Sequence, residues 1–338
     1  MTENISPADA VEQYIQSRHD ALASTQDNHR YRLDHFLVWA DEHGVSEMSE
    51  LDGFDLERYK NWRMSEESPS DCNLVTLEQH LHTLRVFIRW CESADIVSEG
   101  LSDKVLIPNV SSSEKSRDKA ISHERARDII DYLSTYHFAS TMHLSFHISY
   151  HVGCRRSGLH SLDVEDWHSD ERFLSFRNRP EEGTRLKLGD EGERNVTVSD
   201  DTLARALDAY IEERRPDVTD EYGREPLLAS NQGRLHYQTI NKHVYKVTRP
   251  CFIGADCPHD RDPDECEATQ YSGYSKCPSS VSSHPIRRSA ITHHLSEDVP
   301  KEIVSERMSV STDVLDLHYD ARTKEEKRQN RAKYLDDV

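Results

Sequence analysis

The apolar residues between Leu74 and Cys91 recur at alternating intervals of three and four positions. This period matches an α-helix with one buried face and excludes a strand, in which buried residues alternate. The other members of the stripe are Leu77, Leu81, Leu84 and Ile88. A helix with a single apolar face must pack against other elements, so this stretch predicts a helical unit.

Three earlier segments supply the partner helices. Ser6 followed by Pro7 is typical of a helix start, with a capping side chain and a proline in the first turn. A second helix is predicted over 31–39, and a third over 56–63. The buried stripe predicted for the first helix is Val11, Tyr14, Ile15 and Leu22. The first hundred residues therefore predict a four-helix unit.

Residues 108–118 are polar and poor in large apolar side chains, which is typical of a linker. A chain of 338 residues is long enough for two domains. We therefore predict a helical domain over 1–107, a linker over 108–118 and a second domain over 119–338, which contains a cysteine-rich insert at 251–277.

The second domain mixes helix and strand patterns. Ser122 is predicted to cap one helix, and residues 139–152 form another. Residues 173–176 and 196–198 alternate as strands around a charged hairpin loop, 181–193. Two further helices are predicted at 200–213 and 239–247. The fold class is therefore mainly α with a small β-sheet.

The chain carries 62 acidic and 42 basic residues, a formal net charge of −20. Such acidity ordinarily opposes binding to nucleic acid. In molar salt, however, the Debye length falls to about 3 Å, and a few placed arginines can replace a basic surface. The composition alone leaves two classes open: a halophilic DNA enzyme, and an acidic enzyme that acts on a small molecule.

Long apolar segments are missing from the sequence. No run reaches the roughly 18 to 20 residues that cross a bilayer, and the polar start is unlike a signal peptide. There is also no glycine-rich phosphate loop, so no nucleotide cofactor is expected. We expect a cytoplasmic protein whose seven cysteines are reduced.

A group of side chains suited to phosphodiester chemistry lies near the end of the chain. His284 and Arg287 are three residues apart at a helix start, so both can face one anionic oxygen. Tyr319 follows in a segment that a helical return could bring to the same point. A phenol has a pKa of about 10, and it needs such cationic and imidazole neighbours to act as a nucleophile near neutrality.

His284-x-x-Arg287 followed by Tyr319 resembles the second half of the active site of the tyrosine recombinases, the phage integrase family. The upstream sequence around Arg155, from Gly153 to Leu159, is similar to the first arginine box of that family. Residues 162–167 match the continuation of the box. The resemblance spans nearly the whole chain and is strongest to the integrase-like, Xer-type recombinases of halophilic archaea.

The resemblance implies an N-terminal SAM-like core-binding domain that clamps DNA and a C-terminal α/β catalytic domain. It implies a site-specific recombinase or integrase that cuts and rejoins double-stranded DNA through a covalent 3′-phosphotyrosyl intermediate. The partners would be DNA and further copies of the chain, as a tetramer on two duplexes. The reaction would need neither nucleotide nor metal.

The resemblance also implies a role for each site residue. Arg155 and Arg287 would hold the scissile phosphate, His284 would assist proton transfer, Lys187 would protonate the leaving 5′-oxygen, and Tyr319 would be the nucleophile. The neighbouring Arg156 and Arg288 are assigned to DNA binding. Arg185 and Arg194 compete with Lys187 by position, although arginine is a poor proton donor.

The sequence departs from the family pattern at one position. Most members carry a histidine or tryptophan shortly before the nucleophile, where this chain has Val310. We considered Arg307 or Ser309 as a phosphate-binding substitute, and the sixth residue of the site stays open. Two other activities therefore also stay open: nicking and rejoining of one duplex like a type IB topoisomerase, and DNA-binding regulation by a recombinase fold without catalysis.

Four cysteines lie close together in the insert, with His259 among them: Cys251, Cys257, Cys266 and Cys277. Reduced cysteines favour metal binding over disulfides, and four thiolates suit tetrahedral zinc. The spacings are irregular and include no Cys-x-x-Cys pair. The alternatives are a structural zinc site and a set of small buried thiols in a mobile loop.

Overall fold

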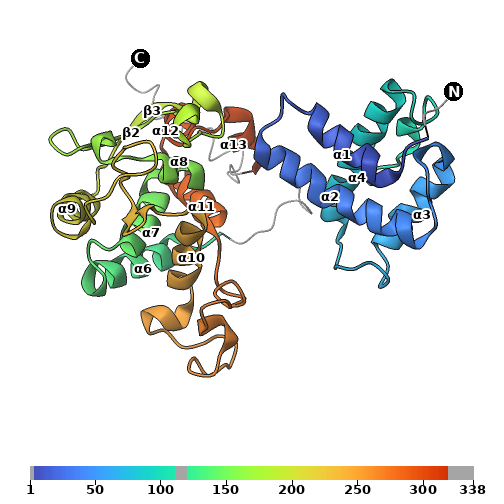
Figure 1. Cartoon of the computed structure of the whole chain (residues 1–338). Coiled ribbons are helices and arrows are strands. Elements are labelled where there is room, and N and C mark those ends of the chain that lie inside the picture. The colour runs from blue at the N-terminus through green and yellow to red at the C-terminus, as the bar shows by residue number, and fades with distance from the viewer. Residues whose placement is uncertain (1–3, 112–119, 319–338) are drawn as a thin grey trace, which may run out of the picture. The chain divides into compact units, whose positions relative to one another are not determined.

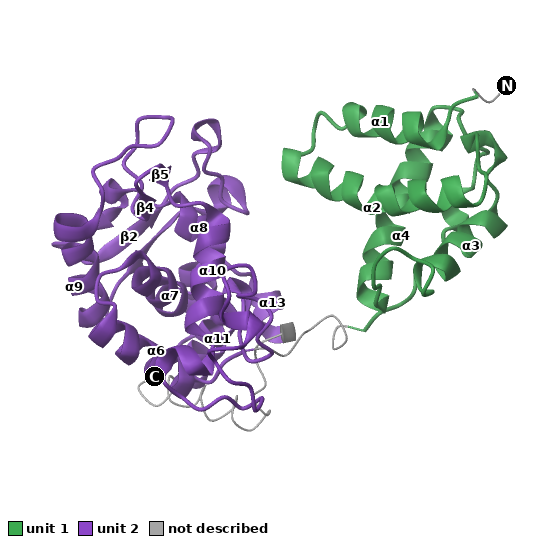
Figure 2. Ribbon diagram, turned by 60° about the horizontal axis from the view of Figure 1, so that its bottom comes forward, with its two compact units in different colours: residues 1–118 green, residues 119–338 purple. Residues whose placement is uncertain are grey.

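A computed structural model of the chain describes residues 4–111 and 120–318. The chain divides into two compact units, residues 1–118 and 119–338 (Figure 2). Among the described residues, no helix is both long enough and apolar enough to span a bilayer.

The first unit is a helical bundle with a single apolar core. Its elements are α1 (Pro7–Ser17), α2 (Ala23–Glu42), η1 (Met48–Glu50), α3 (Gly53–Arg63), α4 (Leu74–Ser93) and η2 (Ser102–Lys104). The predicted cap of α1 is confirmed, because the Ser6 hydroxyl accepts from the Asp9 amide at 3.2 Å. Asn73 caps α4 through the Thr76 amide at 2.9 Å.

Two apolar residues of the first unit were wrongly placed by periodicity. Leu22 does not join the stripe of α1, because α1 ends at Ser17; Leu22 precedes α2 and is 46% exposed. Leu74 is 47% exposed because it begins α4, before the buried face of that helix starts. The rest of the α4 stripe lies in the core, packed against α1, α2 and α3.

The second unit is mainly helical with two small sheets (Figure 1). Its helices are α6 (His123–Tyr136), α7 (Thr141–Val152), α8 (Arg156–Ser161), α9 (Asp201–Ala209), α10 (Tyr237–Val247), α11 (Ser283–Ser296), α12 (Lys301–Met308) and α13 (Thr312–His318), with a π-helical turn η6 (Tyr210–Arg214) extending α9. The short 3-10 helices are η3 (Val164–Asp166), η4 (Pro180–Glu182), η5 (Gly189–Gly192), η7 (Pro250–Ile253) and η8 (Glu267–Thr269).

The larger sheet is antiparallel, in the order β1–β2–β3. Its strands are β1 (Trp167–His168), β2 (Phe173–Phe176) and β3 (Arg194–Thr197), and β4 (Ala229–Ser230) pairs with β5 (Gly233–Arg234) in a second sheet. The predicted hairpin is confirmed, with Leu174 opposite Val196. The strand β3 starts at Arg194, two residues before the predicted start.

Helix α7 organises the second unit. It packs against α6, α8, α9, α10 and α11, and nine of its 12 residues are buried. One apolar cluster joins α7 to the sheet and α9, and another joins it to α6, α11 and α12. The C-terminal end of α7 therefore meets segments from the whole unit, and the candidate site forms there.

Candidate active site

The turn after α7 depends on a glycine. Gly153 has a φ of +64°, a conformation that side chains with a Cβ disfavour. A Cβ at Gly153 would lie 2.6 Å from the Met308 sulfur at the end of α12. The missing side chain thus lets the end of α12 pack directly on the turn that leads into Arg155, the residue before α8.

Arg287 is buried in the first half of α11, with 3% of its surface exposed. Its Nη1 donates to the carbonyl oxygens of Gly153 at 2.6 Å and Met308 at 2.5 Å. Its Nη2 lies 3.4 Å from the carbonyl oxygen of Ser309. These bonds satisfy carbonyls at the ends of two helices and fix the plane of the guanidinium.

A second guanidinium reaches the same point. Arg155 Nη1 donates to the Ser309 carbonyl at 2.8 Å, so Arg155 and Arg287 meet at one oxygen. Ser309 ends α12 in the left-handed conformation, with a φ of 50°. We call this set of residues the arginine junction: Gly153, Arg155, Arg287, Met308 and Ser309.

Lys187 lies on the loop between β2 and β3 and is exposed. It lines a cavity of about 10 Å³ together with Arg155, Arg194 and Ser309. The preceding residue is fixed, because the Leu186 amide donates to the Asn178 side chain at 3.0 Å. The loop therefore presents an ammonium group beside the arginine junction.

The base of this loop is held by a buried ionic network. Arg179 pairs with Thr184 through backbone bonds of 2.8 and 3.0 Å, and its side chain donates to both oxygens of Asp166, at 2.8 and 3.0 Å. The neighbouring Asp163 carboxylate is almost fully buried and pairs with Arg234 at 2.5 Å and Arg224 at 3.2 Å. The box after Arg155 thus anchors the hairpin loop.

His284 lies one turn before Arg287 on α11 and is exposed. Its pKa is lowered by desolvation of the ring, and then by the positive charges of Arg287, Arg288 and Arg155. The structure therefore places His284 in the electrostatic field of both junction arginines. A lowered pKa keeps the imidazole neutral near pH 7, the form that accepts a proton.

Comparison with known proteins gives a fold. No protein-family model and no curated protein matches the chain. Among solved structures, the Tn1549 transposon integrase in complex with circular intermediate DNA matches with a TM-score of 0.67 and 13% identity, covering 97% of this chain and 99% of the other. A lambda integrase dimer bound to a core site matches with a TM-score of 0.63 and 11% identity, covering 94% and 77%.

The N-terminal domain of a phage integrase/site-specific recombinase from Haloarcula marismortui is 34% identical, with a TM-score of 0.30, covering 31% of this chain and 99% of that domain. The two integrase structures, each matched over nearly the whole of this chain, decide the fold. The chain has the tyrosine recombinase fold.

Within this tyrosine recombinase fold, the two rivals of Lys187 have different positions. Arg185 is exposed and is not among the residues that line the cavity. Arg194 lines it, but its guanidinium stacks 4.2 Å from the ring centre of Phe176 and donates to the carbonyl of Arg307 at 2.7 Å. Burial lowers the pKa of Arg194 to about 10. Arg194 therefore joins β3 to α12.

The open position of the tyrosine recombinase pattern is filled by apolar packing. Val310 is 7% exposed and belongs to the apolar cluster of α11 and α12. Arg307 donates to the carbonyls of Thr197 at 2.9 Å and His151 at 3.1 Å, so its guanidinium ties α12 to β3 and α7. Ser309 belongs to the arginine junction through its carbonyl oxygen, which accepts a hydrogen bond from Arg155. These contacts give Arg307 a structural role.

The remaining predicted residues lie at the edges of the site. The Arg156 guanidinium stacks 4.8 Å from the ring centre of Tyr237, and Arg288 is partly buried on α11. Tyr319 and the rest of the tail lie outside the described residues, and the described chain ends with α13. That helix is attached to α12 through the apolar Leu315 and through the Lys301–Asp316 ion pair.

Sequence reasoning missed Met308 as a member of the arginine junction, and it considered Ser309 as a phosphate binder without foreseeing the role of its carbonyl oxygen. The Met308 and Ser309 carbonyl oxygens bind the arginines, and backbone oxygens leave no mark on residue type. The available signal was Gly153, since a glycine directly after a buried helix often marks a left-handed turn or a close approach.

Proposed function

We propose that this chain is a site-specific DNA recombinase that cuts and rejoins DNA through a covalent 3′-phosphotyrosyl intermediate. One observation carries the proposal: Arg155 and Arg287, from separate segments, meet at the Ser309 carbonyl, with Lys187 lining the cavity beside them. Two oriented guanidinium groups next to an ammonium group suit a phosphodiester whose charge grows in the transition state.

In the proposed reaction, Arg155 and Arg287 hold the non-bridging oxygens of the scissile phosphate. The phenolic oxygen of Tyr319 attacks phosphorus and forms the new P–O bond, while the bond to the 5′-oxygen breaks. His284, neutral because its pKa is lowered, takes up the phenolic proton, and Lys187 gives a proton to the leaving oxygen. Attack by another 5′-hydroxyl reverses these steps, so ligation needs no nucleotide.

Double-stranded DNA is the proposed partner, and several copies of the chain act together. The Tn1549 integrase structure contains DNA, and the lambda integrase structure is a dimer bound to a core site. Exchange of both strands between two duplexes calls for four cleavages, which supports a tetramer. We also propose that the net charge of −20 reflects work in high salt.

The test is a covalent trap in molar KCl. End-labelled duplexes that carry a nick and a randomised core are incubated with the full chain, and the products are separated under denaturing conditions. We expect an adduct with the native chain, none with Tyr319→Phe, and an undiminished adduct with Tyr136→Phe, which alters an exposed tyrosine of α6. An adduct that persists in Tyr319→Phe contradicts the proposed nucleophile.

Two results would replace the proposal with another activity. If the protein retains duplexes of the randomised pool through repeated rounds of selection, but no adduct forms, the chain is a DNA-binding regulator. If adducts form and a single duplex is relaxed, while two duplexes never exchange strands, the activity is that of a type IB topoisomerase. Exchanged strands between two labelled duplexes support the recombinase.

A further inference from the structure

The segment between α10 and α11, residues 248–282, has almost no core of its own; we call it the cysteine insert. Among the described residues of the insert, regular structure is limited to the short helices η7 and η8. Its only buried apolar side chains among these residues are Ala268 and Val281. In Figure 1 it projects from the unit beyond α10. Folding such a segment normally requires a covalent or metal staple.

The chain nevertheless folds back tightly on itself in the insert. A Cβ added to Gly273 would lie 1.8 Å from the Glu267 carbonyl oxygen, so two backbone stretches are in direct contact. At the ends of the insert, the Val281 amide donates to the Thr248 hydroxyl at 3.0 Å. The insert therefore has a defined path that its few apolar contacts do not explain.

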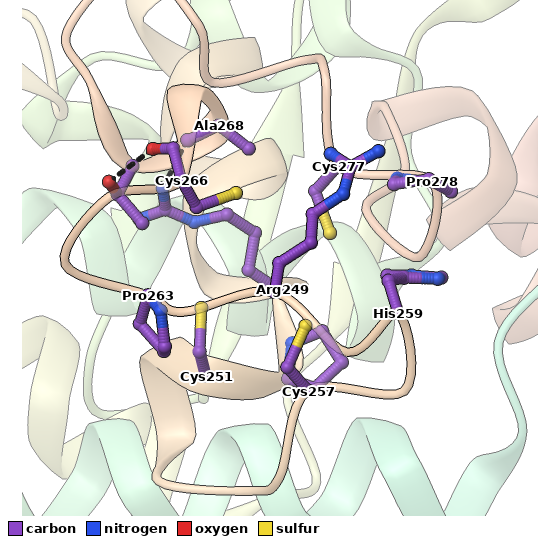
Figure 3. Close-up of a pocket in the computed structure, with 12 residues that line it drawn as sticks. Arg249, Cys251, Cys257, His259, Pro263, Cys266, Ala268, Cys277 and Pro278 are labelled. Carbon is purple, nitrogen blue, oxygen red and sulfur yellow. Dashed lines mark hydrogen bonds between the residues drawn. The ribbon is translucent and has the colours of Figure 1, made fainter.

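The four thiols of the insert surround one cavity. Cys251, Cys257, Cys266 and Cys277 all line it, and all four are partly buried free cysteines. Figure 3 shows their sulfur atoms turned toward the space between them. The cavity has a volume of about 20 Å³, which is room for one small ion or one water molecule.

A buried cation lies in the wall of the same cavity. Arg249 is 7% exposed, and its guanidinium donates to the carbonyls of Ala268 and Lys246. In the part of the chain that the structure describes, no carboxylate pairs with Arg249. A buried charge is costly without a counter-charge. Four thiolates around a divalent ion carry net negative charge and would balance Arg249.

We propose that Cys251, Cys257, Cys266 and Cys277 bind one zinc ion that staples the cysteine insert. In this structure no three His, Cys, Asp or Glu side chains of the described residues stand close enough together to hold an ion. Binding therefore requires the four thiols to move closer together than they lie in this structure.

The ligand set is four cysteines rather than three cysteines and a histidine. His259 also lines the cavity, but its ring is turned away from the sulfur atoms in Figure 3. Its Nε2 lies 2.8 Å from the Ser279 hydroxyl. Tetrahedral sulfur coordination selects zinc among the common divalent ions, because the harder magnesium and calcium prefer oxygen.

The metal would steady the approach to α11. Cys277 lies shortly before Ser283, the first residue of α11, whose amide donates to the Asn241 side chain at 3.1 Å. The Arg125 side chain also donates to the Ser279 carbonyl at 2.9 Å. A staple at Cys277 therefore restrains the segment that leads into His284 and Arg287.

The test measures metal content and does not depend on recombination. The full chain is produced in zinc-supplemented medium, freed of loosely bound ions by gel filtration, and assayed by mass spectrometry of the metal. We expect about one zinc per chain, with four thiols shielded from a thiol reagent. Cys251→Ser and Cys277→Ser should lose most of the zinc, whereas Cys72→Ser, a partly buried cysteine of the first unit, should keep it.

Cobalt provides a second measurement if a serine variant fails to fold. Cobalt added to the native chain after zinc removal should give the intense visible absorption of a tetrahedral sulfur site. The proposal is overturned by less than about one-tenth of a zinc per chain, by weak octahedral cobalt absorption, or by disulfides detected in the intact mass. Equal zinc in all variants would also overturn it, because it would show an adventitious ion only.

Discussion

The arginine junction and the cysteine insert are both irregular stretches of the second unit, but they are ordered in different ways. At the junction, two guanidinium groups supply donors to the backbone carbonyls of Gly153, Met308 and Ser309. In the insert, four thiols face a cavity and a buried arginine has no carboxylate among the described residues. One region completes its own polar contacts, whereas we propose that the other is completed by a metal ion.

The largest effect should come from removing a junction arginine. Arg287→Leu removes the donor of the Gly153 and Met308 carbonyl oxygens, whereas the Ser309 carbonyl keeps its bond from Arg155, and each buried unsatisfied acceptor costs about 1–3 kcal/mol. We expect a loss of at least about 3 kcal/mol in the free energy of unfolding. Urea denaturation of the full chain, followed by tryptophan fluorescence and circular dichroism, measures it.

Arg249→Leu is the matched change in the insert. It removes donors from two carbonyls, one of which ends a helix, so we expect a smaller loss of about 1–2 kcal/mol. If Arg249→Leu destabilised the metal-free chain as much as Arg287→Leu, the contrast between the two regions would be wrong.

The second prediction separates packing from backbone strain. Gly153→Ala places a methyl group 2.6 Å from the Met308 sulfur at a φ of +64°, and should cost about 2–4 kcal/mol. Gly254→Ala has a φ of +79° but meets nothing within 4 Å, and should cost about 1 kcal/mol. Thermal unfolding of both variants measures the difference.

A double mutant sharpens this prediction. In a Met308→Ala background the clash is gone, so Gly153→Ala should cost only as much as Gly254→Ala. An unchanged cost in that background would mean that the strained turn, and not contact with α12, makes the glycine necessary.

The smallest effect concerns the charge of the junction. Arg288→Gln should raise the pKa of His284, because Arg288 is one of the positive charges that lower it, and the junction bonds stay intact. A proton NMR titration measures this, with His284→Gln identifying the resonance. A pKa that is unchanged or lower in Arg288→Gln would show that the charge of Arg288 does not lower the pKa of His284.

The sign of the stability effect follows from the same shift. The folded-state pKa of His284 lies below its unfolded value, so its contribution is complete above about pH 6.5 and is lost as the pH falls through the lowered pKa. His284→Gln should therefore weaken the pH dependence of unfolding on the acid side of neutrality. Arg288→Gln should also weaken this pH dependence, because it raises the folded-state pKa of His284 toward the unfolded value.

Periodicity recovered the elements whose buried faces are regular. The stripe of α4 after Leu74 agrees with the structure, since burial there follows the helix period. The hairpin strand at 173–176 is also present, although three of its four residues are buried in succession. Helix α2 starts at Ala23, whereas the prediction began at residue 31. The first turns of α2 are polar and lack a side-chain cap, so the sequence shows no start signal there. Short elements such as α8 and α12 were missed, since they have too few turns for a period.

The site was predictable as a set of residue types but not as a geometry. Spacing and resemblance brought out Arg155, Lys187, His284 and Arg287, all of which the structure places around the end of α12 or in the field of the junction. The shared Ser309 oxygen was not predictable, because it depends on the left-handed end of α12 and on packing against Gly153.

Helix α12 gives the arginine junction a mechanical consequence. Its last carbonyl oxygens bind both guanidinium groups, and the chain then continues directly into α13. Under the proposed function, a neighbouring copy that displaced α13 would therefore shift the carbonyl oxygens that hold Arg155 and Arg287, without contacting either side chain.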